Sequence, residues 1–159
     1  MNHSLASLAV HLTEIALEQR EVERHALEKV GHIIERRAKV KIGEYQAEAG
    51  PFAAWAELAD STKADRVRQG YSEDEPGLRS GGMRDSIEST VEVPEVQTGS
   101  NDDKLVFFEM GTRNQPPRSV LGGAVVDEMD KIIDTIGHAV HASLIGEGVV
   151  DRRMEIIEG

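Results

Sequence analysis

Apolar residues in the first third of the chain recur at the spacing of one helical face. They lie mostly three or four positions apart, at Leu5, Leu8, Leu12, Ile15, Val22, Ala26, Val30, Ile33 and Val40. The pattern predicts one long helix over about residues 4–45, with Asn2 or Ser4 as its N-cap. Further apolar residues beside this set widen the face, which favours packing against a sheet over an isolated coiled coil.

Two glycines predict where this helix is interrupted. Gly31 lies within the apolar pattern, where glycine costs about 1 kcal/mol relative to alanine. We therefore expect either a kink at Gly31 or a close approach by a neighbouring segment. Gly43 marks the expected end of the helix.

The next segment, residues 46–85, is predicted to be a loop-rich excursion because glycines and prolines separate its short apolar groups. Ser61 is placed to cap a short helix that ends before Gly70, and the acidic run at residues 73–75 predicts an exposed loop. Trp55 is the only tryptophan. We expect it to anchor the excursion to the body of the protein.

Alternating apolar and polar residues predict a small antiparallel sheet over residues 86–112. One face of the first strand carries Ile87, Ser89, Val91 and Val93, and the other carries Glu88, Thr90 and Glu92. Val96–Gly99 is expected to pair back on this strand. The bulky apolar run Lys104–Met110 is predicted to form a third strand.

A second helix is predicted over about residues 119–145, with Ser119 as its cap. Its expected core face consists of Leu121, Val125, Met129, Ile132, Ile136 and Val140. Residues 147–159 are predicted to be a C-terminal tail. The fold class is therefore α+β, a single domain over residues 1–146 in which a long N-terminal helix and a C-terminal helix pack on a small antiparallel sheet with long loops.

Composition and charge exclude several classes of protein. The 159 residues include no cysteine, which excludes disulfides, thiolate nucleophiles and cysteine-ligated zinc. The formal net charge is -11, and residues 1–45 carry equal numbers of acids and bases, so the whole acidic excess lies in residues 46–159. Such a surface disfavours direct nucleic-acid binding. The apolar runs are too short to cross a membrane, so we expect no membrane interaction.

No pattern in the chain indicates catalysis, a cofactor or a metal. Glutamate and histidine pairs at helical spacing occur at Glu21 with His25, Glu28 with His32, and His138 with His141. None forms the HExxH motif, and helices rich in these residues produce such pairs by chance. The glycine-rich segment 80–83 lacks the lysine of a phosphate-binding loop and leads into a predicted strand. These patterns by themselves name no function.

Three motifs follow one another in the second half of the chain. The first is Trp-x-x-Leu at residues 55–58, the second is LRSGGMRDSI at 78–87, and the third is FEMGTR at 108–113, followed by Pro116, Pro117 and Arg118. In this order and spacing they resemble the phage head-tail joining and tail completion family, also called the minor tail protein Z or HK97 gene-product-ten-like family. The matching positions are Trp55, Leu58, Leu78, Arg79, Gly82, Arg84, Ser86, Ile87, Glu109, Gly111, Thr112, Arg113 and Pro117.

The resemblance implies a structural protein of the virion that is not an enzyme. It would be assembled in the host cytoplasm and would form a homo-oligomeric ring at the neck between tail tube and head connector or stopper proteins. DNA would pass nearby without specific binding, and no cofactor is implied. The matching positions would serve as interface or structural residues, within the loops at residues 50–82 and 112–118 and beside them. Glu109 would pair with Arg113 or Arg84, and Gly111 would supply a turn.

Three alternatives remain open at this stage. Within the phage class, the chain could be a tail terminator or another neck subunit. In a different class, it could be an acidic regulator that binds a partner through its N-terminal helix. A small enzyme is the third alternative, and it would require a concave site with a perturbed ionisable group.

Overall fold

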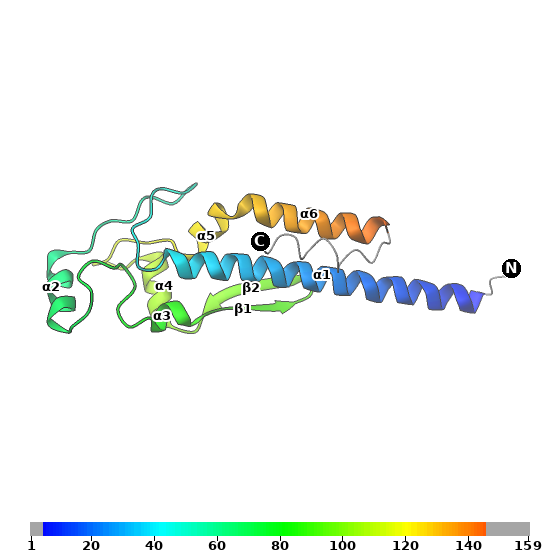
Figure 1. The fold of residues 1–159 in the computed structure, drawn as a ribbon, viewed down its shortest axis with the longest axis horizontal. Coiled ribbons are helices and arrows are strands. Elements are labelled where there is room, and N and C mark those ends of the chain that lie inside the picture. The colour runs from blue at the N-terminus through cyan, green and yellow to red at the C-terminus, as the bar shows by residue number, and fades with distance from the viewer. Residues whose placement is uncertain (1–4, 146–159) are drawn as a thin grey trace.

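The computed structural model describes residues 5–145. Its elements are α1 (Leu5–Lys41), α2 (Asp60–Arg68), α3 (Gly82–Asp85), β1 (Ile87–Glu92), β2 (Glu95–Ser100), α4 (Asp103–Met110), α5 (Leu121–Asp127) and α6 (Met129–Ile145). The long helix α1 lies between the two-stranded ribbon on one side and α5 and α6 on the other (Figure 1). The α+β class is confirmed. The proposed N-cap of α1 and the expected tail lie outside the described residues.

The two strands pack against α1 at the glycine that interrupts its apolar pattern. They pair antiparallel from Ile87 opposite Ser100 to Glu92 opposite Glu95. The hydroxyl of Ser89 donates a hydrogen bond of 2.9 Å to the carbonyl oxygen of Gly31. A Cβ on Gly31 would lie 2.9 Å from the Cβ of Ser89, so only glycine admits the strand at this distance. The close approach predicted at Gly31 is therefore found.

The predicted third strand is wrong: residues 103–110 form the helix α4, and the sheet ends at Ser100. The carboxylate of Asp102 caps this helix by accepting a hydrogen bond of 3.0 Å from the backbone N–H of Lys104. Leu105 and Phe108 are buried one helical turn apart, whereas Val106 and Phe107 are exposed. The cap and the packing of one helical face outweigh the high strand propensity of this run.

The second long helix is divided, and its predicted core face is partly wrong. It consists of α5 and α6, which are separated at Glu128. Ala124, Ile132 and Ala139 are buried, and the remaining members of the predicted face are half-buried or exposed, including Met129, Ile136 and Val140. Small side chains let these helices approach α1 closely, so alanine is buried in place of the larger residues.

Helix α1 ends at Lys41 rather than at about residue 45. Gly43 has a φ of 109° and donates its backbone N–H to the carbonyl oxygen of Pro76 over 2.8 Å. This left-handed conformation ends the helix and turns the chain into the excursion. The predicted short helix of the excursion is α2, but Ser61 lies inside it, and the N-cap is Ala59.

The core lies where α1, α3, α4 and α5 meet. Ile87 and Val120 are fully buried in it, and the ring of Trp55 packs edge-on against Phe108 with centroids 5.3 Å apart. The predicted role of Trp55 as the anchor of the excursion is confirmed.

At the other end of the molecule, every side chain described between residues 5 and 21 is exposed, which corrects the expectation that this whole helical face packs in the core.

A partly buried cluster of charges joins the C-terminal end of α1 to the end of α5. The ammonium of Lys41, which is 2% exposed, lies 2.7 Å from Oδ2 of Asp127, and the guanidinium of Arg37 lies 2.6 Å from the same oxygen. Partial burial alone would raise the pKa of the Asp127 carboxyl. The hydrogen bonds from Lys41 and Arg37 outweigh burial and hold this pKa below its ordinary value.

Replacing Asp127 with asparagine should lower the free energy of unfolding by about 2 kcal/mol at neutral pH, because it leaves Lys41 buried without a charge partner. Since the folded-state pKa of Asp127 is depressed, its contribution is present above the ordinary value of 3.8 and is lost as the pH falls through the lower folded value. Urea denaturation over a pH series should show the difference between wild type and variant shrinking at acidic pH. A difference that stays constant would contradict this assignment.

Candidate assembly interface

Most of the positions that match the family motifs gather near the end of the molecule opposite the N-terminus. The excursion, with α2, and the loop of residues 111–118 lie together at this end (Figure 1). Between them is a cleft of about 430 Å³ whose lining includes Leu58, Arg66, Phe108 and Arg118. Beside it, residues 110–117 surround a shallow hollow of about 460 Å³. Loops held on a fixed scaffold are the usual sites of contact with other molecules.

The loop after α4 has a fixed conformation. Gly111 has a φ of 73°, a region that residues with a Cβ rarely adopt. Thr112 and Gln115 exchange backbone hydrogen bonds of 2.8 and 3.2 Å, and the backbone N–H of Arg118 donates to the carbonyl oxygen of Phe108 over 2.8 Å. The turn predicted at Gly111 is confirmed. The loop returns on itself and presents Arg113 and Pro117 to solvent.

Glu109 caps the helix α5, which corrects the predicted pairing with Arg113 or Arg84. Its two carboxylate oxygens accept hydrogen bonds from four donors: the Ser119 hydroxyl at 2.8 Å and the backbone N–H groups of Val120, Leu121 and Gly122 at 2.5, 2.9 and 3.0 Å. The first N–H groups of a helix have no partner within it, and they carry a partial positive charge. The carboxylate of Glu109 is therefore more stable against these N–H groups than beside an exposed arginine.

Ser119 bonds both to Glu109 and to a further N–H group of α5. Its hydroxyl oxygen accepts a hydrogen bond of 3.0 Å from the backbone N–H of Gly123, and its O–H donates to the carboxylate of Glu109. The N-cap of α5 is Val120, one position after the predicted Ser119, although the Ser119 hydroxyl still accepts an N–H of the first turn. Together the two side chains join the end of α4 to the start of α5, so the loop of residues 111–118 is fixed at both ends.

A buried arginine joins this loop to the excursion. Arg118 is 3% exposed, and its guanidinium donates to the carbonyl oxygen of Ala56 over 2.8 and 3.1 Å and to that of Glu57 over 3.2 Å. It also lies over the ring of Phe108, with its Cζ 5.5 Å from the centroid. Burial lowers the pKa of this guanidinium. The backbone carbonyls and the ring replace the water that the charge has lost.

Replacing Arg118 with lysine should lower the free energy of unfolding by about 1–2 kcal/mol. The planar guanidinium bonds two carbonyl oxygens and also lies over the Phe108 ring, and a single ammonium cannot make all of these contacts. Urea denaturation followed by the fluorescence of Trp55 would measure it. Arg68 to lysine is the matched control, since Arg68 is exposed on α2 and should change stability by less than about 0.5 kcal/mol. Equal effects of the two substitutions would contradict the linking role of Arg118.

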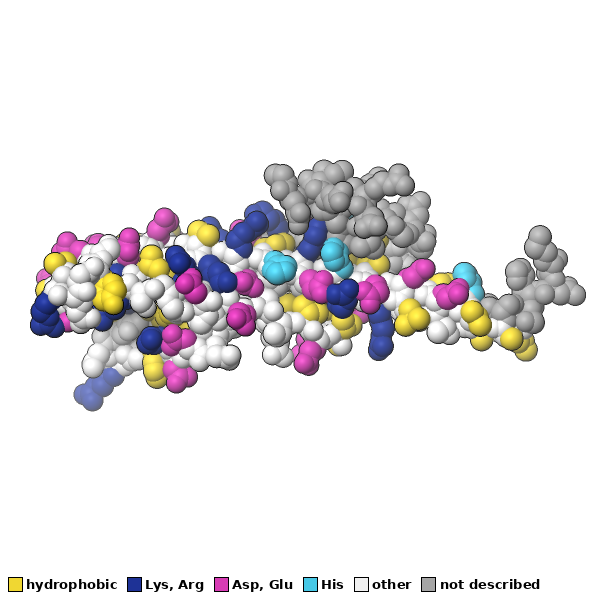
Figure 2. Space-filling view, turned by 60° about the horizontal axis from the view of Figure 1, so that its bottom comes forward, with side chains coloured by type: hydrophobic (Ala, Val, Ile, Leu, Met, Phe, Trp, Pro, Cys, Tyr) yellow, Lys and Arg dark blue, Asp and Glu magenta, His cyan; other side chains and the backbone are white. Residues whose placement is uncertain are grey.

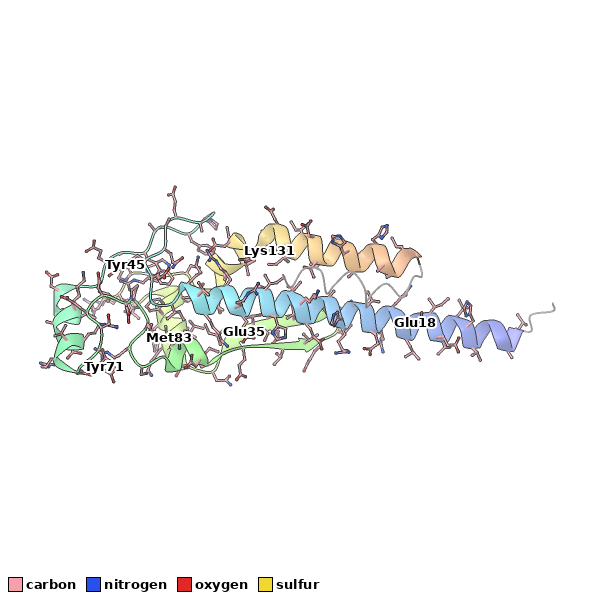
Figure 3. The ribbon with its side chains drawn as sticks, in the orientation of Figure 1. Glu18, Glu35, Tyr45, Tyr71, Met83 and Lys131 are labelled. Atoms are coloured by element: carbon pink, nitrogen blue, oxygen red, sulfur yellow. The ribbon has the colours of Figure 1, made fainter. Side chains whose placement is uncertain are left out.

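A second buried arginine and a tyrosine fix the excursion itself. Arg66, on α2, donates to the carbonyl oxygens of Ser72 and Leu78 over 2.7 and 2.6 Å. The hydroxyl of Tyr45 donates to the carboxylate of Asp74 and accepts the backbone N–H of Leu58 over 3.0 Å. Burial and the bond to Asp74 raise the pKa of the Tyr45 hydroxyl. Figure 3 shows Tyr45 where the chain leaves α1 for the excursion.

The remaining motif positions divide into buried and exposed sets. Ile87 is fully buried, Leu78 packs against the core, and the hydroxyl of Ser86 donates to the carbonyl oxygen of Met83 over 2.8 Å. These positions are structural. Arg79 is exposed: its guanidinium is 2.7 Å from Asp65, with its Cζ 5.6 Å from the centroid of the Tyr71 ring.

Of the other motif positions, Arg84 is half-buried, and Gly82 and Arg113 are exposed. Arg84 pairs with its neighbour Asp85 at 3.0 Å, and Gly82 begins α3. In the part of the chain that the structure describes, Arg113 has no hydrogen-bond or ion-pair partner and is exposed at the loop. The structure thus brings Leu58 and the loop of residues 111–118 together around one cleft and places Gly82 and Arg84 on α3, next to α4 (Figure 1).

From the sequence we did not predict that Arg66, Arg118, Lys41 and Tyr45 fix the conformation of the end of the molecule opposite the N-terminus. Arginine and lysine are mostly exposed in proteins, so nothing in their spacing marked them as buried. The only available signal was the place of Arg118 directly after Pro117, where a loop returns to the body of the protein.

Comparisons with known protein families, with curated proteins and with solved structures found no match. Within residues 5–145, no group of three or more histidine or carboxylate side chains is placed to hold a metal ion. The helices described there include none that is long and apolar enough to cross a membrane.

Proposed function

We propose that this chain is a non-enzymatic structural protein of a phage virion, a subunit of a homo-oligomeric ring at the head-tail junction that completes the tail or joins it to the head. The observation that carries the proposal is the loop of residues 111–118. It contains the last three residues of the third family motif, most of its residues are exposed, and Glu109, Gly111 and Arg118 hold it in one conformation.

A loop that is already ordered loses little conformational entropy when it binds, which suits a contact repeated around a ring. The exposed face of this loop offers a free cation at Arg113 and apolar surface at Pro116 and Pro117, and Met110 at the end of α4 adds apolar surface beside it. A contact between two different surfaces of identical subunits generates a closed ring when the rotation closes. The loop of one subunit against the excursion of the next is such a contact.

The charge of the chain suits a channel that DNA passes without binding. The formal net charge of -11 repels phosphate. On the face shown in Figure 2, acidic and basic side chains are interspersed, so the acidity of that face is not gathered in one patch. The proposed partners are tail tube protein on one side of the ring and head connector or stopper protein on the other.

Light scattering over a concentration series, with negative-stain imaging, tests the proposal. A closed ring formed by the protein alone, or only with tail tube or connector protein, supports it and gives the stoichiometry. The variant Arg113→Glu should weaken ring formation at least about tenfold without changing the fold. Arg36→Glu, an exposed arginine on α1, is the matched control. A monomer that binds neither partner would contradict the proposal.

A second candidate function is a regulator that binds a partner through its N-terminal helix, and the exposed side chains of residues 9–21 favour it. In that case a peptide of residues 1–45 should capture the partner by itself while the whole chain stays monomeric. Within the phage class, a tail terminator or another neck subunit differs in which partner the ring binds, and the two partner proteins above separate these alternatives.

A further inference from the structure

The cleft between the excursion and the loop of residues 111–118 is lined by more cations than anions. Its wall includes Arg66, Arg79 and Arg118, and Glu57 is the only carboxylate among its lining residues. Its volume of about 430 Å³ lies in the range of clefts that bind ligands. The formal net charge of the chain is -11, so the charge of this cleft is opposite in sign to that of the whole molecule.

Two of these arginines are buried without an ion-pair partner. Arg66 is 4% exposed and Arg118 is 3% exposed, and neither guanidinium forms an ion pair in the part of the chain that the structure describes. The carboxylate of Asp74 senses the charge of Arg66, but it is bonded to the Tyr45 hydroxyl and lies 3.3 Å from the ammonium of Lys63. Buried charges are usually paired with a charge of opposite sign, and these two lack one.

Each buried guanidinium also retains an amino group without a hydrogen bond. Arg66 and Arg118 donate to backbone carbonyl oxygens through Nε and Nη2, and Nη1 of each has no partner among residues 5–145. Within the same range, Oε2 of Glu128 is the only buried side-chain polar atom without a hydrogen bond. Both Nη1 groups are therefore in contact with solvent. A ligand in the cleft can accept hydrogen bonds from them.

The remaining charges near the cleft do not neutralise these two arginines. Arg79 is paired with Asp65 at 2.7 Å, and the carboxylate of Glu57 lies 3.8 Å from the ammonium of Lys63. The exposed cation of Arg113 lines the shallow hollow beside the cleft and adds positive charge there. The site is therefore positive, and it favours an anionic ligand.

The shape and donors of the cleft favour the carboxylate of an amino-acid side chain. A whole guanidinium fork binds phosphate or carboxylate through two parallel hydrogen bonds, but here Nε and Nη2 are already bonded. Two separate Nη1 groups suit the two oxygen atoms of one carboxylate. The wall also includes apolar side chains that can cover an aliphatic stem, namely Leu58, Phe108 and Pro116.

We propose that this cleft binds a glutamate or aspartate side chain of a protein partner, whose carboxylate becomes the counter-ion of Arg66 and Arg118. The apolar wall would hold the stem of that side chain. The inference goes beyond the proposed neck function and does not depend on it, because it concerns what the cleft of a single chain binds. Its test is made at a concentration where light scattering gives a monomer, so its result is separate from ring formation.

NMR titration of the full chain with blocked pentapeptides tests the proposal. The probe has one glutamate between glycines, and the matched peptide has glutamine in its place. The glutamate peptide should shift the Nε–H signals of Arg66 and Arg118 to saturation and bind at least about tenfold more tightly. Equal binding of the two peptides, or no saturable shift at these arginines, would overturn the proposal. So would tighter binding of glutarate or inorganic phosphate, which would make a free anion the ligand.

Substitutions on the wall of the cleft test the site without removing the buried arginines. Thr62→Glu adds a carboxylate to the lining and should weaken binding of the glutamate peptide at least about tenfold. Ala64→Glu, on the same helix but exposed and outside the lining, adds the same charge and should weaken it less than about twofold. Glu57→Gln should strengthen binding at least about twofold. Equal effects of Thr62→Glu and Ala64→Glu would overturn the proposal.

Discussion

Replacing Gly111 with valine is expected to lower the free energy of unfolding by about 4 kcal/mol. The backbone there has a φ of 73°, which strains any residue with a Cβ and a β-branched one most. A Cβ would also lie 2.7 Å from the backbone nitrogen of Pro117 and 2.9 Å from the carbonyl oxygen of Gln115. Both neighbours are backbone atoms, so the loop would have to open. Urea denaturation followed by Trp55 fluorescence measures the loss.

Gly70 is the matched control for this substitution. Its φ is 79°, close to that of Gly111, but a Cβ there would meet nothing within 4 Å. Gly70→Val should therefore lower the free energy of unfolding only by the backbone strain, about 1–2 kcal/mol. The difference between the two variants measures the closure of the loop on Gly111. If both variants lost the same stability, the tight turn described here would be incorrect, and ring formation should then survive Gly111→Val.

Replacing Glu109 with alanine is expected to lower the free energy of unfolding by about 3 kcal/mol. The substitution leaves the Ser119 hydroxyl and the N–H groups of Val120, Leu121 and Gly122 without their acceptor, and hydrogen bonds to a charged group are about twice as strong as neutral ones. It also removes the link between α4 and α5. Thermal and urea denaturation of the purified variant would measure the loss.

Two further variants separate charge from geometry at this cap. Glu109→Gln keeps one acceptor oxygen and should lose about half as much stability as the alanine variant. Glu95→Ala removes an exposed carboxylate at the end of the ribbon and should change the free energy of unfolding by less than about 0.5 kcal/mol. If Glu109→Ala lowered the free energy of unfolding by no more than Glu95→Ala does, the cap would contribute nothing to stability.

The long helix could be predicted because its signal is periodic and local. Val22, Ala26 and Val30 repeat at helical spacing, and Gly43 ends the element by a conformation that glycine alone adopts readily. Trp55 could be predicted as an anchor because a lone large aromatic ring is usually buried. Each of these inferences needed only the residues near it in the chain.

The helix α4 could not be predicted in this way. Val106, Phe107 and Phe108 favour a strand by propensity, and the helix forms because Asp102 caps it and the core accepts Leu105 and Phe108. The buried face of α6 was likewise set by the helix against which it packs. Ala139 is buried against α1, whereas Ile136 is exposed. Tertiary packing decided both cases.

The candidate interface was predicted in outline but not in its chemistry. The sequence placed Glu109 and Gly111 at the end of an element and before a loop, and the structure agrees with that placement. The partner of Glu109 could not be read from the chain because it is backbone N–H, which every non-proline residue carries. The acceptors of Arg118 are carbonyl oxygens, which leave no mark in the sequence for the same reason.

Binding to carbonyl oxygens has an evolutionary consequence for the excursion. Arg66 and Arg118 hold it at Ala56, Glu57, Ser72 and Leu78 through main-chain oxygen atoms, so the side chains at these four positions take no part in the bonds. The amino acids at Ala56, Glu57 and Ser72, whose side chains are exposed, can change while the path of the chain is kept, provided that the two arginines and the core residue Leu78 persist. One surface could in this way acquire new binding specificities on an unchanged frame.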